Sequence, residues 1–195
     1  WINGQEAGTH ADGHTTFELR IDQFLRYGDE ENTITVKLDN NSYDRGAWWK
    51  WGGISGGASL KIRNTAKLDW QHIVSTPDLA AKTAELNITY RMDNASNAEK
   101  QYTLVTEVID QQTNSTVGTV RTSITLAAMQ NDQTVSAQLH LDNVKLWYLD
   151  DPNLYTVKTW LKDGAQTIHY VEDDIGIRKI EINDCKFYLN GEHLR

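Results

Sequence analysis

Polar and apolar residues alternate with a period of two along much of the chain. On a β-strand this alternation places apolar side chains on one face and polar side chains on the other, which is typical of a half-buried strand. Polar turn clusters separate these segments at residues 27–32, 93–97, 111–115 and 162–165. Short strands at this spacing predict antiparallel sandwiches and an all-β protein. The alternating positions are Phe17, Leu19, Ile21; Ile34, Val36, Leu38; Leu86, Ile88, Tyr90, Met92; Tyr102, Leu104, Thr106, Val108; Val135, Ala137, Leu139, Leu141; and Tyr155, Val157, Thr159, Leu161.

One segment has a composition that also suits a helix. Residues 78–85 follow Pro77, which would suit a helix start. We nevertheless expect a loop that runs into a strand. Composition changes near Asn64, because most of the 13 glycines and a cluster of three tryptophans precede it. We therefore predict a domain boundary at about residues 64–68, with domains of residues 1–64 and 65–180.

Asn-Gly pairs stand close to both ends of the chain, at Asn3-Gly4 and Asn190-Gly191. Asn-Gly is a strong signal for a tight β-hairpin, since both turn positions need positive φ. Two residues precede the first turn and four follow the second. Both hairpins look cut, so we expect this chain to be a segment of a longer protein whose chemistry lies elsewhere.

Charge and cysteine content exclude several classes of function. The net charge is -8, the pI is near 5.2 and no run of Lys or Arg occurs, so the sequence lacks the basic footprint of a nucleic-acid or anionic-membrane binder. No apolar run approaches the roughly 20 residues that span a bilayer. The single Cys185 cannot form an internal disulfide, and we interpret it as a turn residue.

Few residues form recognisable chemical motifs. His10, Asp12 and His14 could face one side of a strand and bind zinc, but the intervening Gly13 favours a loop. Acidic runs such as residues 29–31 and 172–174 lack the spacing of a calcium loop and read as solvated turns. We predict no metal and no cofactor. The motifs of acyl, phosphoryl and hydride transfer do not occur either.

The densest functional candidate is the run of residues 39–54, which follows the strand predicted at residues 34–38. It combines amides, carboxylates, an arginine and three tryptophans. Flat aromatic rings beside Asn, Asp and Arg suit the apolar faces and polar rims of sugars. The alternative is that Trp49 and Trp51, two residues apart, fill a domain interface, and this alternative is slightly favoured.

Several blocks resemble glycoside hydrolase family 2, which includes β-galactosidases, β-glucuronidases and β-mannosidases. Residues 1–8, 17–19, 32–40 and 52–54 resemble its N-terminal sugar-binding jelly roll. Leu146-Trp147, residues 151–157 and residues 175–180 resemble the end of its immunoglobulin-like domain, and residues 187–191 resemble the first hairpin of its TIM barrel. The order of the blocks makes the match specific. The resemblance implies a partial jelly roll at 1–64, an immunoglobulin-like sandwich at 65–180 and the start of the barrel at 181–195.

The resemblance also implies an activity for the parent protein. In this family the two catalytic glutamates of a retaining exo-glycosidase lie on the barrel, so no catalytic residue is expected in this segment and the segment alone should be inactive. Jelly-roll loops of the family reach the barrel mouth. The matching substrate-binding candidates in this chain are Asp39, Asn40, Asp44, Arg45 and Trp49.

Two other classes of function stay open. One is a stand-alone carbohydrate-binding module that uses Trp48, Trp49 and Trp51, and the other is a structural or adhesive pair of sandwiches. The expected partners are a carbohydrate substrate and the barrel domain, with no nucleic acid and no membrane span, and self-association into a homo-oligomer is left open. A polysaccharide-degrading context slightly favours a periplasmic or extracellular location over a cytoplasmic one.

Overall fold

The computed structural model describes residues 1–12, 15–39, 53–54 and 56–194. Its contacts divide the chain into two compact units, Trp1–Lys61 and Ile62–Arg195, which we describe separately. Apart from one short 3-10 turn, η1 (Asp22–Phe24), every helix or strand of the described residues is a β-strand. The predicted all-β class is therefore confirmed. The structure also contains no helix, among the residues it describes, that could cross a membrane.

In the first unit the predicted Asn3-Gly4 turn is present. Asn3 and Gly4 have φ values of 51° and 79°, and Ile2 forms antiparallel bridges with Gln5 and Ile34. The Asn3 amide donates hydrogen bonds to the Phe24 carbonyl (2.9 Å) and the Asn32 side chain (2.8 Å). The turn is thereby tied to residues about 20 to 30 positions away in the sequence.

Two strands predicted in the first unit do not form in the part that the structure describes. Alternation at Phe17, Leu19 and Ile21 and at Ile34, Val36 and Leu38 predicted strands, yet only the isolated bridge at Ile34 appears. The side chains of Phe17, Ile34 and Val36 are largely exposed. Alternation alone does not form a strand, because the backbone also needs a ladder of partners, and the bonds between residues 33–35 and residues 1–3 do not extend into one.

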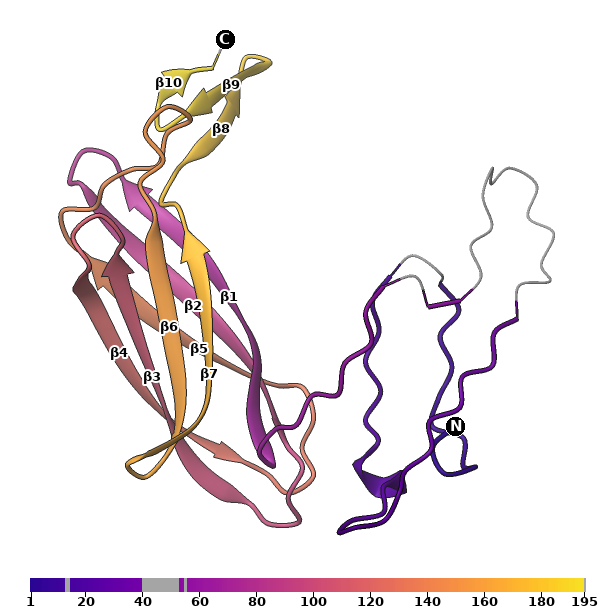
Figure 1. Ribbon diagram of the computed structural model, residues 1–195. Helices are drawn as coiled ribbons and strands as arrows, with labels where there is room; N and C mark the ends of the chain where they lie inside the picture. Colours follow the sequence, from indigo (N-terminus) through magenta and orange to yellow (C-terminus); the bar gives the residue numbers. More distant parts are fainter. Residues whose placement is uncertain (13–14, 40–52, 55, 195) are drawn as a thin grey trace. The chain divides into compact units, whose positions relative to one another are not determined.

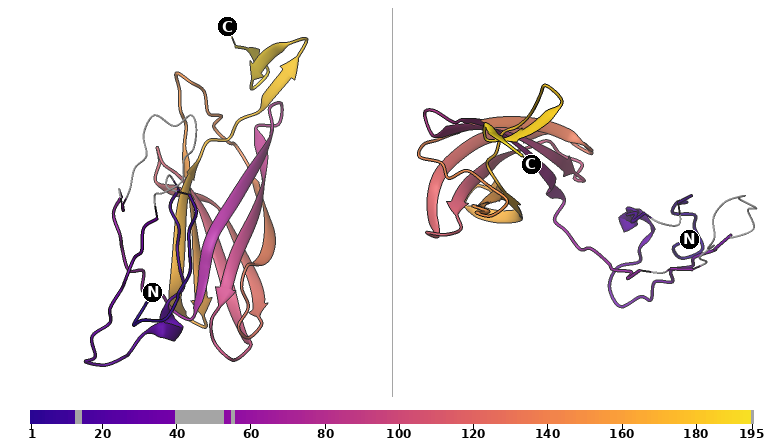
Figure 2. Two further views of the ribbon diagram at one scale, coloured as in Figure 1. Left: turned by 90° about the vertical axis from the view of Figure 1, so that its right-hand side faces the viewer. Right: turned by 90° about the horizontal axis from the view of Figure 1, so that it is seen from above.

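The second unit contains ten strands in three antiparallel sheets (Figure 1). Two sheets, ordered β1-β2-β5 and β4-β3-β6-β7, form the predicted immunoglobulin-like sandwich, whose layers are visible in Figure 2. The third sheet, ordered β10-β9-β8, is a small hairpin sheet at the end of the chain. The strands are β1 (Ala66–Asp78), β2 (Thr83–Asn94), β3 (Lys100–Asp110), β4 (Ser115–Leu126), β5 (Gln133–Leu141), β6 (Tyr155–Asp163), β7 (Gln166–Ile175), β8 (Ile180–Asn183), β9 (Lys186–Leu189) and β10 (Glu192–His193).

The β1–β2 connection settles the one segment that could have been helical. β1 runs to Asp78, residues 79–82 form a turn in which Lys82 has φ 56°, and β2 starts at Thr83. The expected loop into a strand is confirmed. Asp78 accepts hydrogen bonds from the Ala80 and Ala81 amides at 2.9 Å, which stabilises the turn.

The core lies between the two sheets of the sandwich. Alternate residues of each strand point inward, and the fully buried side chains include Leu68, Leu86, Ile88, Met92 and Leu104. Burying one such side chain stabilises the fold by about 1.5–3 kcal/mol. This apolar contact is what holds the layers together.

A continuous chain of hydrogen bonds also crosses the core. The Tyr90 and Thr106 hydroxyls are 2.7 Å apart, the Thr106 and Thr159 hydroxyls are 2.7 Å apart, and the Thr159 hydroxyl donates to Gln71 Oε1 at 2.6 Å. Gln71 Nε2 then donates to the Val157 carbonyl at 3.0 Å. Tyr90 and Gln71 belong to one sheet, Thr106 and Thr159 to the other. We call these four side chains the core relay.

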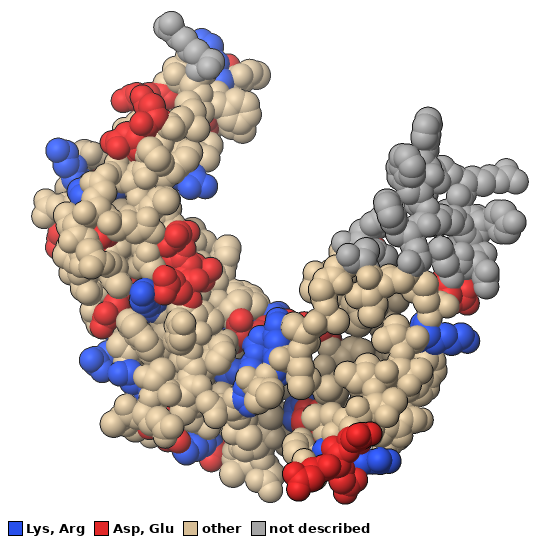
Figure 3. Space-filling view, in the orientation of Figure 1, with Lys and Arg blue, Asp and Glu red and all other residues tan. Residues whose placement is uncertain are grey.

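Charged side chains gather where the chain enters the sandwich. Asp69 forms ion pairs with Lys67 (2.8 Å) and Arg91 (2.5 Å), and Lys67 also pairs with Asp93 (3.0 Å). Burial raises the pKa of Asp69, but the hydrogen bonds from Lys67 and Arg91 outweigh it and hold that pKa below its usual value. Elsewhere basic and acidic residues intermingle on the visible surface of the sandwich (Figure 3).

Candidate functional site

Most of the predicted substrate-binding residues lie outside the described residues. Asn40, Asp44, Arg45 and Trp49 belong to this group, and only Asp39 has a described position, where it is exposed. The geometry of the predicted sugar contacts therefore stays a prediction. No cluster of three or more His, Cys, Asp or Glu side chains suited to a metal ion occurs in the described ranges.

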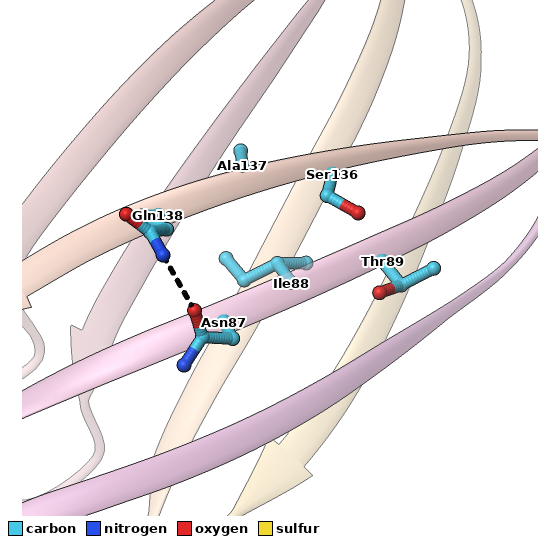
Figure 4. A pocket seen from close by; sticks show the side chains of 6 residues that line it. All are labelled: Asn87, Ile88, Thr89, Ser136, Ala137 and Gln138. Carbon is cyan, nitrogen blue, oxygen red and sulfur yellow. Dashed lines mark hydrogen bonds between the residues drawn. The ribbon is translucent and has the colours of Figure 1, made fainter.

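A shallow depression of about 450 Å³ lies on the outer face of β2 and β5 (Figure 4). Its lining residues are Asn87, Ile88, Thr89, Ser136, Ala137 and Gln138. Gln138 Nε2 donates a hydrogen bond to Asn87 Oδ1 at 3.0 Å across the two strands. Since none of the six side chains is ionisable, the depression offers no general acid, general base or nucleophile of the kind a hydrolase needs.

Loops that are distant in the sequence meet at one end of the sandwich, next to the β8–β10 sheet. We call this region the junction. The Trp147 amide donates a hydrogen bond to the Ile177 carbonyl at 2.8 Å, and the Arg178 guanidinium lies 5.0 Å from the centroid of the Trp147 ring. Gly176 lies against the same ring: a Cβ added there would come within 2.7 Å of Trp147 Cγ and Cδ1. Only glycine fits this position without displacing the indole.

Asn190 joins the hairpin sheet to the junction. It has φ 51°, which Asn tolerates better than most residues, and it is 7% exposed. Its Oδ1 accepts a hydrogen bond from the Lys179 amide at 2.8 Å, and its Nδ2 donates to the Trp147 carbonyl at 3.0 Å. The Asn190 amide donates to the Lys179 carbonyl at 2.7 Å. One side chain thus connects the β9–β10 turn to both loops of the junction.

Asn153 performs the corresponding role within the β5–β6 loop. This buried side chain donates from Nδ2 to the Leu146 carbonyl at 2.9 Å and to Asp151 Oδ2 at 3.0 Å. Its Oδ1 accepts from Gln112 Nε2 at 2.5 Å. The loop that carries Trp147 is therefore fixed to the β3–β4 turn as well.

An ion pair and a tyrosine hold the start of the same loop. Lys145 Nζ lies 2.8 Å from Asp110 Oδ2, and the Lys145 amide donates to the Tyr155 hydroxyl at 2.7 Å. The hydrogen bond from Lys145 holds the pKa of Asp110 below its usual value, while burial raises the pKa of Tyr155. The ion pair and the hydrogen bond fix the start of the loop, and no pair of carboxylates with opposed pKa shifts lies among the described groups of the junction.

The junction residues belong to three separate sequence blocks that the family resemblance picked out. The sequence did not predict that these blocks converge. The available signal was the concentration of Asn, Gly and Trp in loops, where core packing does not require them. The structure shows that they meet to orient one sheet on another, and it assigns them no reaction chemistry.

Comparison with known proteins agrees with this arrangement. The profile of glycosyl hydrolases family 2 matches residues 67–178, more than half of the chain. A β-galactosidase of Thermoanaerobacter pseudethanolicus is 30% identical over 100% of this chain and 26% of its own length. A putative β-glucuronidase of Formosa agariphila is 29% identical over 100% of this chain and 23% of its own length. The chain thus spans about a quarter of the length of these curated relatives.

Solved structures give the same result. A putative β-galactosidase from Bacteroides fragilis superposes with a TM-score of 0.80 at 26% identity, covering 100% of this chain and 30% of that one. A family 2 member from Bacteroides cellulosilyticus gives a TM-score of 0.79 at 26% identity, with coverage of 100% and 26%. Since the profile matches more than half of the chain and the relatives align over all of it, the conclusion is that this chain belongs to glycosyl hydrolases family 2.

Proposed function

We propose that this chain forms the non-catalytic β-domains of a retaining exo-glycosidase that hydrolyses β-galactosides or β-glucuronides. The relatives named above support the substrate class, and the share of their length that this chain spans leaves room for a separate catalytic domain. In this proposal the segment 181–195 begins the catalytic barrel, and the residues before it support the barrel and shape its pocket. The chain alone has no hydrolase activity.

The observation that carries the proposal is the apolar face of the β8–β10 sheet. Ile180 pairs with Leu189 and Ile182 pairs with Phe187, so all four side chains lie on one face. Ile180, Ile182 and Phe187 are 59%, 69% and 55% exposed. Large apolar side chains that gather on one exposed face mark an interaction surface.

This face continues into the sandwich. A hollow of about 400 Å³ is lined by the end of β7, by β1 residues that include the exposed Val74, and by Ile180 of β8. Because Asn190 and Trp147 fix the hairpin sheet to the sandwich, the apolar face keeps a constant position relative to the hollow, which Ser75, Asp174 and Arg178 also line. We propose that the rest of the catalytic barrel packs on them, so that its position is set by the junction.

The test compares hydrolysis of p-nitrophenyl β-D-galactoside and β-D-glucuronide by residues 1–195 and by the full-length polypeptide. We expect activity only in the longer protein. In that protein Ile182→Asp should lower the thermal midpoint and kcat, because it places a charge in the packed face. The control is Glu181→Gln, since Glu181 points to the opposite face of the hairpin sheet. Hydrolysis by residues 1–195 would refute the proposal that these domains are non-catalytic. An Ile182→Asp enzyme with the same thermal midpoint and kcat as the control would refute the docking face.

We also propose that the run 39–51 contributes substrate contacts, with Asn40 as the first candidate beside Asp39, Asp44, Arg45 and Trp49. Support comes from the mixture of amide, carboxylate and aromatic groups and from the family resemblance. In the full-length enzyme Asn40→Ala should raise KM for the preferred glycoside several-fold while the thermal midpoint stays constant. An unchanged KM would remove Asn40 from the site.

A further inference from the structure

A pair of aromatic residues lies on the outer face of the β4-β3-β6-β7 sheet. Trp160 of β6 is directly opposite Tyr170 of β7, two strands that run side by side in Figure 1. Their neighbours Leu161 and His169 point toward the core, so this pair points away from it. Tyr170 is 60% exposed and Trp160 is partly exposed. Opposite Cβ atoms on neighbouring strands lie about 4.5–5.5 Å apart, which places the two side chains next to each other.

The tryptophan helps to cover the sheet. Val105 of β3 is opposite Trp160 on one side and opposite Arg121 of β4 on the other, on the same outer face. Val105 is nevertheless only 2% exposed. A valine on an outer face stays this buried only where neighbouring side chains lie over it. We therefore infer that the indole lies across the sheet, leaving its other face toward solvent beside the Tyr170 ring.

The polar groups of the two rings and two nearby cations have no partner among the described residues. Neither the Trp160 indole N–H nor the Tyr170 hydroxyl takes part in the hydrogen bonds of the described residues, and the two rings make no ring contact with each other. Lys162, two residues after Trp160 on β6, and Arg121 have no carboxylate partner in the described part of the chain. By contrast, Lys158 on the same face forms a 3.1 Å ion pair with a glutamate of β7. A chain of net charge -8 thus keeps two cations without a carboxylate partner on this face: Lys162 two residues from the partly exposed Trp160, and Arg121 two strands away from it.

This combination selects one class of ligand. Aromatic faces pack on the C–H faces of sugar rings, and the indole N–H and phenol hydroxyl supply hydrogen bonds at their edges. Lys and Arg bind carboxylates through charge-assisted hydrogen bonds. Arg121, Val105, Trp160 and Tyr170 lie opposite one another on four adjacent strands. At the usual strand spacing this row is about 14 Å long, which is longer than a single sugar ring.

We propose that this Trp160–Tyr170 face binds acidic oligosaccharides. The site lies on the immunoglobulin-like sandwich and is distinct from the substrate contacts proposed at residues 39–51. Family membership makes a glycan the favoured partner, and the unpaired cations favour an acidic one. The site would hold a uronate-containing chain on the enzyme without taking part in bond cleavage.

The experiment titrates ¹⁵N-labelled residues 1–195 with tetragalacturonic acid and with galactotetraose as the neutral counterpart. Signals of the Trp160 indole N–H and the Tyr170 amide should shift in a saturable manner. We expect the dissociation constant for the acidic sugar to be at least five-fold lower than for the neutral one, and to rise with salt. No saturable shift at about 10 mM sugar, or equal binding of the two sugars, would overturn the proposal.

Variants localise the site. Tyr170→Ala and Trp160→Ala should each weaken binding of tetragalacturonic acid at least ten-fold, and the double variant Arg121→Gln/Lys162→Gln should bind the two sugars equally. Tyr170→Ala carries the test if Trp160→Ala unfolds by uncovering Val105. The matched control is Trp70→Ala on the other sheet, where the Arg91 guanidinium already lies 5.1 Å from the ring centroid. Tighter binding of hexaglutamate than of the sugar would identify a protein surface instead and refute the glycan site.

Discussion

Asn190→Ala should release the hairpin sheet from the sandwich. The substitution leaves the Lys179 amide and the Trp147 carbonyl without the partners they have at 2.8 and 3.0 Å. Both bonds are partly buried, and since a fully buried group left unsatisfied costs about 1–3 kcal/mol, that range is an upper limit for each of them. Alanine at φ 51° adds roughly 1–2 kcal/mol of backbone strain. These contributions sum to about 3–8 kcal/mol, less whatever water recovers by entering the opened junction.

Two further variants separate these contributions. Asn190→Gly removes both side-chain hydrogen bonds but tolerates the positive φ, so it should be about 1 kcal/mol less damaging than alanine. Asn190→Asp keeps the acceptor for the Lys179 amide and loses the donor to Trp147, where it sets a carboxylate oxygen against a carbonyl oxygen. It should therefore also destabilise the junction.

The assay is amide hydrogen exchange at β8 and β9, supported by urea unfolding of the whole chain. The opening free energy of the hairpin should fall by the amounts above, while amides in the centre of β2 and β3 change little. If Asn190→Ala exchanges at β8 and β9 within about 0.5 kcal/mol of the wild-type protein, the junction does not hold the hairpin sheet and the reasoning is refuted.

Three other substitutions test the packing around this site and the core. Gly176→Ala must displace the Trp147 ring and should cost about 1–3 kcal/mol in urea unfolding; a smaller loss would mean that the ring moves freely. Thr159→Val removes the donor to Gln71 Oε1, while Gln71 Nε2 keeps its bond to the Val157 carbonyl, and it should cost about 1–3 kcal/mol by the same measurement; a neutral effect would contradict the relay. Burial and nearby cations lower the pKa of His169, so the unfolded chain binds a proton there more readily and the free energy of unfolding should fall as pH drops below about 6.5. His169→Gln should flatten this pH dependence. An unchanged pH profile in the variant would show that His169 is not its source.

The predicted strands that form are β2, β3, β5 and β6, whose inward-facing positions alternate and are mostly apolar and buried. The equally regular alternation at residues 17–21 and 34–38 forms no strand among the described residues. β1 was not predicted as a strand because its register shifts between Leu68 and Trp70, so that Leu68 and Gln71 both point inward. A β-bulge of this kind hides a strand from any search for a strict period of two.

Two other strands were hidden for different reasons. β4 is mostly Ser, Thr and Val, with only Ile124 and Leu126 fully buried near its end, so its sequence has little contrast between faces. β7 carries three consecutive acidic residues and an irregular register with β6 next to Leu161. Both strands form because they pair with a neighbouring strand, and a local sequence pattern does not show such pairing.

The candidate site was predictable in its parts and not in its assembly. Trp147, Asn153, Gly176 and Asn190 lie in the blocks that carry the family resemblance, but that they meet depends on the fold of three loops. Gly176 is the clearest case, since the sequence cannot show which ring lies against it. For the run 39–51, sequence and resemblance are the only guides.

The core relay has a consequence for how the two sheets align. Hydrophobic alternation fixes which face of a strand is buried, yet a slip of two residues would preserve that pattern and move a side chain by about 7 Å. Such a slip would carry the Thr106 and Thr159 hydroxyls away from Tyr90 and Gln71 and leave buried polar groups against apolar neighbours. Four side chains, two from each layer, therefore specify one alignment of the two sheets, whereas burial of apolar side chains alone would be compatible with several.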